Sequence, residues 1–278
     1  MRFYTFDHLT SCYSPQDEST VMTTVDHVAA DLFAAYSTKQ PIEPPRTTIH
    51  NLDLDGAYAI QQAQERAFIA AGHKIVGRKI GLTSIAMQQQ LGVDSPDFGF
   101  FSDQRLYHAG DAIDVAQFIS PKVEPELAFV LAADISATPT TEEVIAAVGS
   151  VHRAVEIIDS RVRDWDIRLV DTVADNASCG AVVIDDAQID VSADLLPTVS
   201  ARMFISGKLA GEGTGAAVMG HPLAPLKWLA EVLGAQGVGL NAGDIILTGS
   251  FCGAAAVAPG QEVTIDYGTY GSMSLTFV

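Results

Sequence analysis

The spacing of apolar residues follows a helical period in the first quarter of the chain. Over residues 25–36, apolar side chains recur every three or four positions, which predicts an amphipathic helix. A second face of this kind covers residues 54–70, with Asp53 or Asp55 as the expected N-cap. Residues 22–73 are therefore predicted to form an N-terminal helical cap.

From residue 74 onward, the pattern changes to short apolar segments bounded by Gly, Pro and Asp, which is typical of β-strands. These segments are 74–82, 121–134, 154–159, 180–185, 201–209, 243–251, 262–268 and 272–278. Helical spacing returns at 140–152 and 222–237. Because strands dominate without a regular strand–helix alternation, residues 74–278 are predicted to form an α+β domain with a large mixed sheet or roll, and not a doubly wound sheet.

The first residues of the chain fit neither pattern. Residues 1–21 mix aromatic residues with polar turn formers, and we expect a disordered extension or an upstream start. The first twenty residues contain one basic residue, Arg2, and no apolar core of signal-peptide length. The three cysteines include no C-x-x-C pair, which indicates a reducing compartment. We therefore expect a cytoplasmic protein.

Composition excludes several kinds of partner. The 278 residues contain 34 Asp+Glu against 16 Lys+Arg, a net charge of −18, so nucleic acid and anionic membranes are not expected partners. At 48% hydrophobic and 18% charged residues, the chain is too apolar to be disordered. No apolar run approaches the roughly 20 residues of a membrane helix. The mean hydropathy of +0.21 is high for a monomer, and we expect a homo-oligomer.

Two glutamates separated by one residue carry the strongest local chemical signal. Glu124 and Glu126 lie in an apolar segment, and residues i and i+2 of a strand share a face. Like charges on an apolar face repel unless a cation lies between them, and carboxylates are suited to Mg²⁺ or Mn²⁺. Glu156, flanked by apolar residues in the next predicted strand, could complete a set of three ligands. Pro125 favours the alternative that both glutamates line the solvated face of an edge strand, and spacing alone does not decide.

Basic residues are few, so their positions are informative. Lys79 lies in the short apolar segment 74–82, where a closed site would lower its pKa or a neighbouring acid would pair with it. Asn176 and Ser178 offer hydrogen-bond donors, although turn-forming residues of this kind are commonly structural. The sequence contains no P-loop, helical zinc-binding histidine pair or G-x-S-x-G motif.

Six segments taken together resemble one family. They are GRKIGLTSIAMQQQLGVDSPDFGFF (77–101), PKVEPELAFVL (121–131), VEIIDSRVRDWDI (155–167), DTVADNASCG (171–180), GHPL (220–223) and AGDIILTGS (242–250). In this order they are similar to the 2-hydroxypenta-2,4-dienoate hydratases, also called 2-keto-4-pentenoate hydratases, of the fumarylacetoacetate hydrolase superfamily. The resemblance begins at about residue 22 and leaves residues 1–21 outside. It implies a mixed β-sheet roll of the fumarylacetoacetate hydrolase type with an N-terminal helical cap, residues 74–278 being the catalytic domain.

The resemblance also implies a metal site and active-site residues. The implied ligands for Mg²⁺ or Mn²⁺ are Glu124, Glu126 and Glu156. Lys79 matches the family's active-site lysine, and Asp97, in SPDFG, matches an acidic residue assigned to proton transfer. Asn176 and Ser178 lie in a stretch that lines the substrate pocket in relatives. Pro125 departs from the family, where a small residue is usual, and this puts the local strand pairing in question.

The activity implied by the resemblance is hydration of a small anionic 2-oxo or 2-hydroxydienoate acid in the meta-cleavage degradation of aromatic compounds. Such an acid chelates the metal through a carboxylate oxygen and its C2 oxygen, which stabilises negative charge at C2. Protonation at C5 makes C4 electrophilic, water adds there, and protonation at C3 leaves a 4-hydroxy-2-oxo acid. Lys79 would stabilise the enolate or move its proton, and Asp97 would take part in proton transfer.

Three related activities and one non-enzymatic role stay open. A 2-oxo-3-hexenedioate (4-oxalocrotonate) decarboxylase uses a similar metal enolate but expels CO₂. The ending TIDYGTYGSMSLTFV (264–278) resembles hydratases of seven-carbon diacids such as 2-oxohept-4-ene-1,7-dioate, which need a further cation for the second carboxylate. An acylpyruvate-type hydrolase would need an activated water beside the metal. Intact Lys79, Asp97 and the three glutamates disfavour a catalytically silent metal-binding partner subunit.

Overall fold

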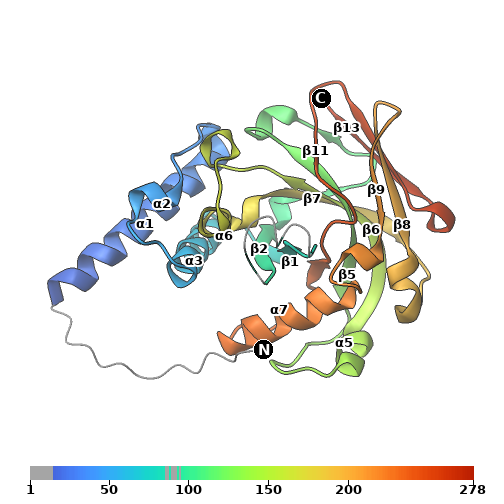
Figure 1. The fold of residues 1–278 in the computed structure, drawn as a ribbon, viewed down its shortest axis with the longest axis horizontal. Helices are drawn as coiled ribbons and strands as arrows, with labels where there is room; N and C mark the ends of the chain where they lie inside the picture. Colours follow the sequence, from blue (N-terminus) through green and yellow to red (C-terminus); the bar gives the residue numbers. More distant parts are fainter. Residues whose placement is uncertain (1–14, 85–87, 89–92, 94) are drawn as a thin grey trace.

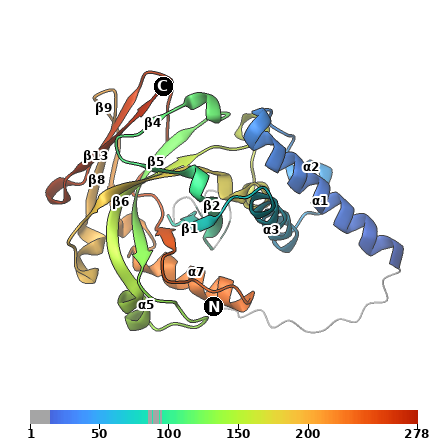
Figure 2. The same cartoon turned by 180° about the vertical axis from the view of Figure 1, so that it is seen from behind.

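The structure is a computed structural model that describes residues 15–84, 88, 93 and 95–278. Its helices are α1 (Pro15–Thr38), α2 (Pro45–Thr48), α3 (Leu54–Ala70), α5 (Thr141–Ala147), α6 (Leu169–Ala174) and α7 (Leu223–Ala235). Its strands are β1 (Ile75–Gly81), β2 (Asp97–Ser102), β3 (Leu106–His108), β4 (Ala112–Ile113), β5 (Lys122–Leu131), β6 (Val148–Ile158), β7 (Cys179–Gln188), β8 (Ser200–Ile205), β9 (Lys208–Thr214), β10 (Ile245–Leu247), β11 (Ala255–Ala256), β12 (Glu262–Asp266) and β13 (Ser272–Phe277). Helices α1, α2, α3 and α6 lie together on one side of the molecule, and β8, β9 and β13 lie on the opposite side (Figures 1 and 2).

The larger sheet closes on itself. Its strand order is β2-β1-β10-β5-β6-β7-β3, with β11 also paired to β5. The two end strands, β2 and β3, are joined in the chain by a single 3₁₀ turn, Asp103–Arg105. Because so short a connection cannot span an open sheet of this width, the sheet curls until its edges meet. The prediction of an α+β fold with a mixed-sheet roll is confirmed.

A side-chain amide seals the seam between the two edges of the roll. Asn176 accepts a hydrogen bond from the Phe100 backbone N–H through Oδ1 (2.8 Å), and its Nδ2 donates to the Phe100 carbonyl (2.9 Å). These are the bonds that a neighbouring strand would make with β2. The side chain of Gln61, on α3, donates to the Phe98 carbonyl further along the same edge (2.8 Å). The edge of β2 is therefore covered rather than left open for pairing with another chain.

The roll has two faces with different surroundings. Its outer face packs on a second sheet, of order β4-β13-β12-β8-β9, in the main core. Val155 on the roll and Met203 and Leu275 on the second sheet are buried in this core. Alternate residues point inward, where a small cluster that includes Ala154 and Leu247 lines the interior of the roll. Side chains on the inner face are therefore held away from water by the closure of the sheet itself.

The helical cap packs on the seam. Leu32, Ile60 and Val173 form part of a separate apolar cluster shared by α1, α3 and α6. The ring of Tyr58 stacks on that of Phe98 on β2, with 4.7 Å between the ring centroids. Asp53 is the N-cap of α3 and accepts a hydrogen bond from the Gly56 N–H (2.9 Å). Two of the expected helices are therefore present, and they cover the edge of β2.

Helix α1 begins earlier than the sequence pattern indicates. The helix starts at Pro15, so the expected boundary between residues 21 and 22 falls inside it. Proline favours the first helical position because the N–H that it lacks would be unpaired there in any case. Residues 1–14, the rest of the expected extension, lie outside the described part of the chain. The division at 22–73 and 74–278 stays a prediction.

Two other expected elements differ from the structure. The helix expected over 140–152 ends at Ala147, and β6 begins at the next residue. A capping box between Thr140 and Glu143 starts the helix, but the later residues alternate between the two faces of the roll and pair with β5. The segment 201–209 is a hairpin of β8 and β9, not one strand, because Ser206 and Gly207 adopt φ values of 49° and 77° that reverse the chain.

Pro125 lies in a central strand, not in an edge strand. Strand β5 pairs with β6 along its whole length and with β10 and β11 on the other side. The Pro125 carbonyl accepts a hydrogen bond from the Phe251 N–H (3.0 Å), in the loop between β10 and β11. The N–H and C=O of one strand residue point to the same side, so the donor that proline lacks would face this gap in the ladder. The edge-strand interpretation of Glu124 and Glu126 is therefore wrong.

No helix among the described residues is long and apolar enough to cross a membrane. The homo-oligomer and the cytoplasmic location stay predictions.

Replacing Asn176 by alanine tests the seam. The change leaves a buried N–H and a buried C=O of Phe100 unpaired and puts alanine at a φ of 52°, which asparagine tolerates better. We expect Asn176→Ala to lower the free energy of unfolding by about 2–3 kcal/mol, measured by urea denaturation. The exposed Asn241→Ala is the control, expected to change the same quantity by less than about 0.5 kcal/mol. Equal effects of the two substitutions would show that the seam does not depend on Asn176.

Candidate metal centre and active site

Three glutamates converge on the inner face of the roll. Glu124 and Glu126 lie two residues apart on the same face of β5, and Glu156 on β6 is the register partner of Glu124. Each side chain offers one carboxylate oxygen, and these oxygens all lie within 4.8 Å of one another. Hard oxygen donors at this spacing fit a divalent cation such as Mg²⁺. The alternation of β5 and the pairing with β6 therefore build the expected set of three ligands.

The set is open to solvent on one side. Glu126 and Glu156 are each 1% exposed, whereas Glu124 is half-buried. Burial and the nearby Glu124 carboxylate raise the pKa of the Cys252 thiol to about 11, and Cys252 is also half-buried. The approach from solvent therefore lies on the Glu124 side of the cluster.

The three carboxyl groups destabilise one another when charged. Burial, followed by the charge of Glu156, raises the pKa of Glu124 to about 8. Burial, Glu156 and Glu124 raise the pKa of Glu126 well above its usual range, against a hydrogen bond from the Gly249 N–H (2.7 Å). Burial also raises the pKa of Glu156, although Lys79 opposes the shift. A bound cation would offset the desolvation and repulsion that cause these shifts, which is the electrostatic argument that the residues fit a metal.

Lys79 reaches across the interior of the roll from β1. Its Nζ lies 3.1 Å from Oε1 of Glu156, and the two side chains are 4% and 1% exposed. Burial disfavours the ammonium, but the attraction of Glu156 and Asp97 outweighs it and raises the pKa of Lys79 above its ordinary value. Of the two sequence-based interpretations of Lys79, pairing with an acid is the one observed, and it places the ammonium beside Glu156, one of the three candidate ligands.

The side chains of Asp97 and Lys79 approach each other beside Gly81, where a larger residue would not fit. Asp97 opens β2 opposite Gly81 on β1, and a Cβ atom on Gly81 would collide with the Asp97 carboxyl group and lie 3.3 Å from Nζ of Lys79. Oδ1 of Asp97 is buried and has no hydrogen-bond partner within the described residues. Burial raises the pKa of Asp97 against the influence of Lys79. The site therefore holds a carboxyl group with a free oxygen beside an ammonium group.

Asn176 and Ser178 are placed differently from the other expected site residues. The amide of Asn176 is used by the Phe100 backbone, and the hydroxyl of Ser178 lies 3.1 Å from that of Thr172. Residues Asn176, Ala177 and Ser178 have φ values of 52°, 49° and 56°, a left-handed turn without glycine. The hydrogen bonds tie this turn to β2 and α6 rather than to the glutamates. That the two residues line the substrate pocket stays a prediction.

A buried ion pair supports this strained turn, and sequence reasoning missed it. Nε of Arg161 lies 2.6 Å from Oδ1 of Asp175, with side chains 1% and 0% exposed. The same guanidinium donates to the carbonyl of Cys179 (2.9 Å) and lies over the ring of Tyr36, 4.3 Å from its centroid. Left-handed conformations persist only where surrounding contacts hold them. In the sequence, Asp175 and Arg161 resemble ordinary turn residues, so only the fold identifies the pair.

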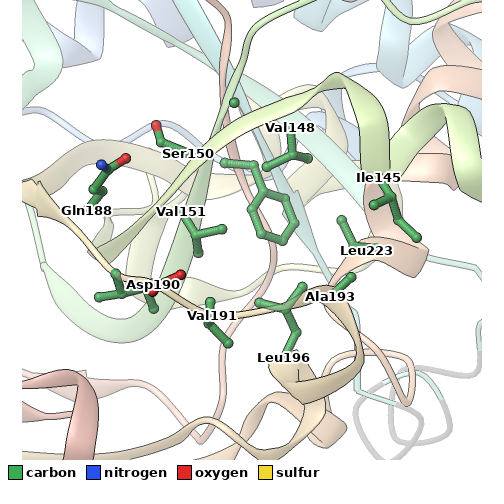
Figure 3. A pocket seen from close by; sticks show the side chains of 13 residues that line it. Ile145, Val148, Ser150, Val151, Gln188, Asp190, Val191, Ala193, Leu196 and Leu223 are labelled. Atoms are coloured by element: carbon green, nitrogen blue, oxygen red, sulfur yellow. The ribbon is translucent and has the colours of Figure 1, made fainter.

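A separate cavity lies away from the glutamates. It has a volume of about 560 Å³ and opens on the outer face of the roll, between β6 and the segment that follows β7 (Figure 3). Val151, Val191 and Leu196 line it, and Asp190 is the one charged residue among its lining. It contains none of the glutamates and no cluster of groups that could carry acid–base or metal chemistry.

Comparison with known proteins identifies the class. Residues 74–278 match the family described as "Fumarylacetoacetate (FAA) hydrolase C-terminal", and the chain belongs to the fumarylacetoacetate hydrolase family. The matched range begins where the sequence pattern changes from helices to strands.

Within this family, the chain is similar to hydratases and to a decarboxylase that act on related acids. The chain is 40% identical over 253 residues to the 2-keto-4-pentenoate hydratase of Paraburkholderia xenovorans (strain LB400), covering 91% of this chain and 94% of that one. It is 37% identical to a 2-hydroxyhexa-2,4-dienoate hydratase of Comamonas testosteroni, covering 88% and 94%. Among solved structures, the 4-oxalocrotonate decarboxylase from Pseudomonas putida G7, complexed with magnesium and adipate, has a TM-score of 0.87 at 34% identity, covering 92% and 98%. The resemblance to the hydratases is confirmed.

Substituting one ligand tests the metal centre. We expect Glu126→Gln to weaken Mg²⁺ binding by more than about tenfold in a calorimetric titration, because an amide loses the charge that attracts the cation. The exposed Glu142→Gln, on α5, should leave Mg²⁺ binding unchanged. Without Mg²⁺, Glu126→Gln should also increase the free energy of unfolding, since it removes a buried like charge. Unchanged Mg²⁺ affinity in Glu126→Gln would contradict the assignment of the ligands.

Proposed function

We propose that this protein is a divalent-metal-dependent hydratase that converts 2-hydroxypenta-2,4-dienoate, or a close 2-hydroxy-2,4-dienoate, into a 4-hydroxy-2-oxo acid. The observation that carries the proposal is the meeting of Glu124, Glu126 and Glu156 with Lys79 and Asp97 inside the roll. Support comes from the curated hydratases that share 37–40% identity over about 90% of the chain.

The three glutamates would hold Mg²⁺ or Mn²⁺. When bound there, such an ion supplies Lewis-acid chemistry at the C2 oxygen of a 2-oxo acid. The solved relatives complexed with magnesium or calcium support a divalent cation. The all-oxygen donor set supports hard cations over Zn²⁺, which prefers nitrogen and sulfur ligands in structural sites.

Lys79 and Asp97 are suited to different steps. The ammonium of Lys79 is stabilised by Glu156 and can donate a hydrogen bond to oxygen charge that develops at C2 of the substrate. Asp97, with its raised pKa and an unbonded oxygen, can hold a proton for C5 while the C2 hydroxyl loses its own. The hydroxyl group of water then bonds to C4 and a proton returns to C3, so the net change is the addition of one water.

Decarboxylation is the second candidate. The 4-oxalocrotonate decarboxylase matches this fold with a TM-score of 0.87, but its 34% identity is below the 40% of the hydratase relative. A silent subunit is disfavoured because the expected lysine, aspartate and glutamates are not only present but brought together in one buried site. Hydration therefore has the stronger support.

The assay that separates these functions offers 2-hydroxypenta-2,4-dienoate and 2-oxo-3-hexenedioate in turn. With Mg²⁺ we expect loss of diene absorbance from the first compound without release of CO₂, and a 4-hydroxy-2-oxo acid as product. A chelator should abolish the reaction, and added Mg²⁺ should restore it. Release of CO₂ from the second compound as the faster reaction would favour decarboxylation, and turnover in chelator would contradict the metal mechanism.

Two variants test the roles of the acid–base residues. We expect Lys79→Ala to lower kcat by at least about 100-fold while Mg²⁺ still binds, because the change removes the cation and not a ligand. Asp97→Asn should also lower kcat and should change the pH profile, since the amide cannot deliver a proton. Lys227→Ala, at an exposed ion pair with Glu231, is the matched control and should retain full activity. Full turnover by metal-loaded Lys79→Ala would refute the assignment.

A further inference from the structure

A molecule that enters the metal site passes a lysine that the proposed chemistry does not use. The site is open on the side of Glu124, because Glu126 and Glu156 are fully buried. In β5, the next residue on the same face in that direction is Lys122, the first residue of the strand. Two strand residues span roughly 6.5 Å, so Lys122 lies one strand repeat beyond Glu124 on the side of the site that is open to solvent, which we call the mouth of the site.

Lys122 is held in place by an aromatic ring. Its Nζ lies 3.9 Å from the centroid of the Trp165 ring, within the range of a cation–π contact. The indole Nε1 of Trp165 donates to the carbonyl of Ser120 (3.2 Å), which fixes the ring beside the start of β5. Both side chains are half-buried. The lysine is therefore oriented, unlike a surface lysine that is free to rotate in solvent.

The segment that carries Trp165 is tied to the start of β5. The carboxylate of Asp159 accepts hydrogen bonds from the N–H groups of Ile119 and Ser120, at 2.7–3.0 Å. Asp164 and Trp165 have φ values of 57° and 56°, a left-handed conformation that costs energy in residues other than glycine. Strain of this kind is found where a side chain must be held in a particular position. Here the result is an indole ring placed under an ammonium group.

The charge of Lys122 attracts the Glu124 carboxylate but forms no salt bridge with it. In the described part of the chain, Lys79 and Lys227 form salt bridges with Glu156 and Glu231, but Lys122 forms none. In a protein with a net charge of −18, the surrounding field repels an anionic ligand. An oriented ammonium group that forms no salt bridge with a described residue would offset this repulsion and bind an anionic group at the mouth.

We propose that Lys122, seated on Trp165, forms a cationic subsite for a carboxylate at the outward end of a ligand whose other end binds at the three glutamates. The inference deepens the proposed function and rests on it: among the 2-hydroxy-2,4-dienoates of that function, it favours those with a second carboxylate over 2-hydroxypenta-2,4-dienoate, which has one. The separation of Lys122 from Glu124 along β5 is one that a short dicarboxylate can bridge.

The test compares two acids of the same chain length, adipate with two carboxylates and hexanoate with one, on the Mg²⁺-saturated protein by calorimetry at fixed ionic strength. We expect the native protein to bind adipate at least about tenfold more tightly, a difference of about 1.4 kcal/mol. Lys122→Gln should abolish this preference without changing hexanoate binding, and Lys122→Arg should retain most of it. Trp165→Leu keeps the charge but removes its support, and should reduce the preference. Lys208→Gln, at an exposed position on β9, should leave it unchanged.

Three results would overturn the subsite. These are the absence of a preference in the native protein, an unchanged preference in Lys122→Gln, and an equal loss of affinity for both acids accompanied by tighter Mg²⁺ binding. The last result would mean that Lys122 only balances the charge of the glutamates. Because no turnover is needed, the outcome is separate from the hydratase assay. Hydration of 2-hydroxypenta-2,4-dienoate without an adipate preference would support the proposed function and reject the subsite. An adipate preference without hydration would support the subsite and reject the proposed function.

Discussion

The structure depends on the burial of like charges inside a closed sheet. Three carboxyl groups with oxygens within 4.8 Å of one another lie on the inner face of the roll, and two of them, Glu126 and Glu156, are closed off from water. Neighbouring groups partly offset the free-energy cost of burying these carboxylates. Lys79 crosses the interior to Glu156, and the Gly249 N–H donates to Glu126 from a φ of 108°. Repulsion among these carboxylates destabilises the site when it is empty, and a cation that takes several oxygen ligands at once would relieve it.

The contacts that close the roll also position residues of the site. The seam depends on the Asn176 amide, which pairs with Phe100 on the strand that Asp97 opens. Asn176 in turn lies in a left-handed turn beside the buried pair of Arg161 and Asp175. Burial raises the pKa of Asp175 to about 6 although Arg161 opposes the shift, so this carboxylate too depends on its partner. A chain of contacts therefore links the helical cap, the seam and Asp97, the residue proposed for proton transfer.

Sequence patterns predicted the local geometry of the site well and its long-range geometry poorly. Alternation placed Glu124 and Glu126 on one face, because the period of a strand is a local property. The pairing of Glu156 with Glu124 and the reach of Lys79 depend on strand order, which no local pattern contains. The helix expected over 140–152 is present only to Ala147, because Val148 and Val151, which continue the helical spacing, pair with Leu131 and Phe129 of β5 instead. The hydrogen bonds of Asn176 to Phe100 were not predicted, because a side chain that takes the place of a strand has no sequence signature.

Pro125, which has no backbone N–H, lies where the pairing of β5 with its neighbours β10 and β11 is interrupted. Strands β10 and β11 both pair with β5, one on each side of Pro125, and the loop between them donates the Phe251 N–H to the Pro125 carbonyl and the Gly249 N–H to Glu126. The donor that proline lacks would face this loop, so no ladder hydrogen bond is lost at Pro125. The gap in strand pairing at Pro125 is therefore filled by a loop that is distant in the sequence. Through this gap, the Gly249 N–H reaches a glutamate in the interior of the roll.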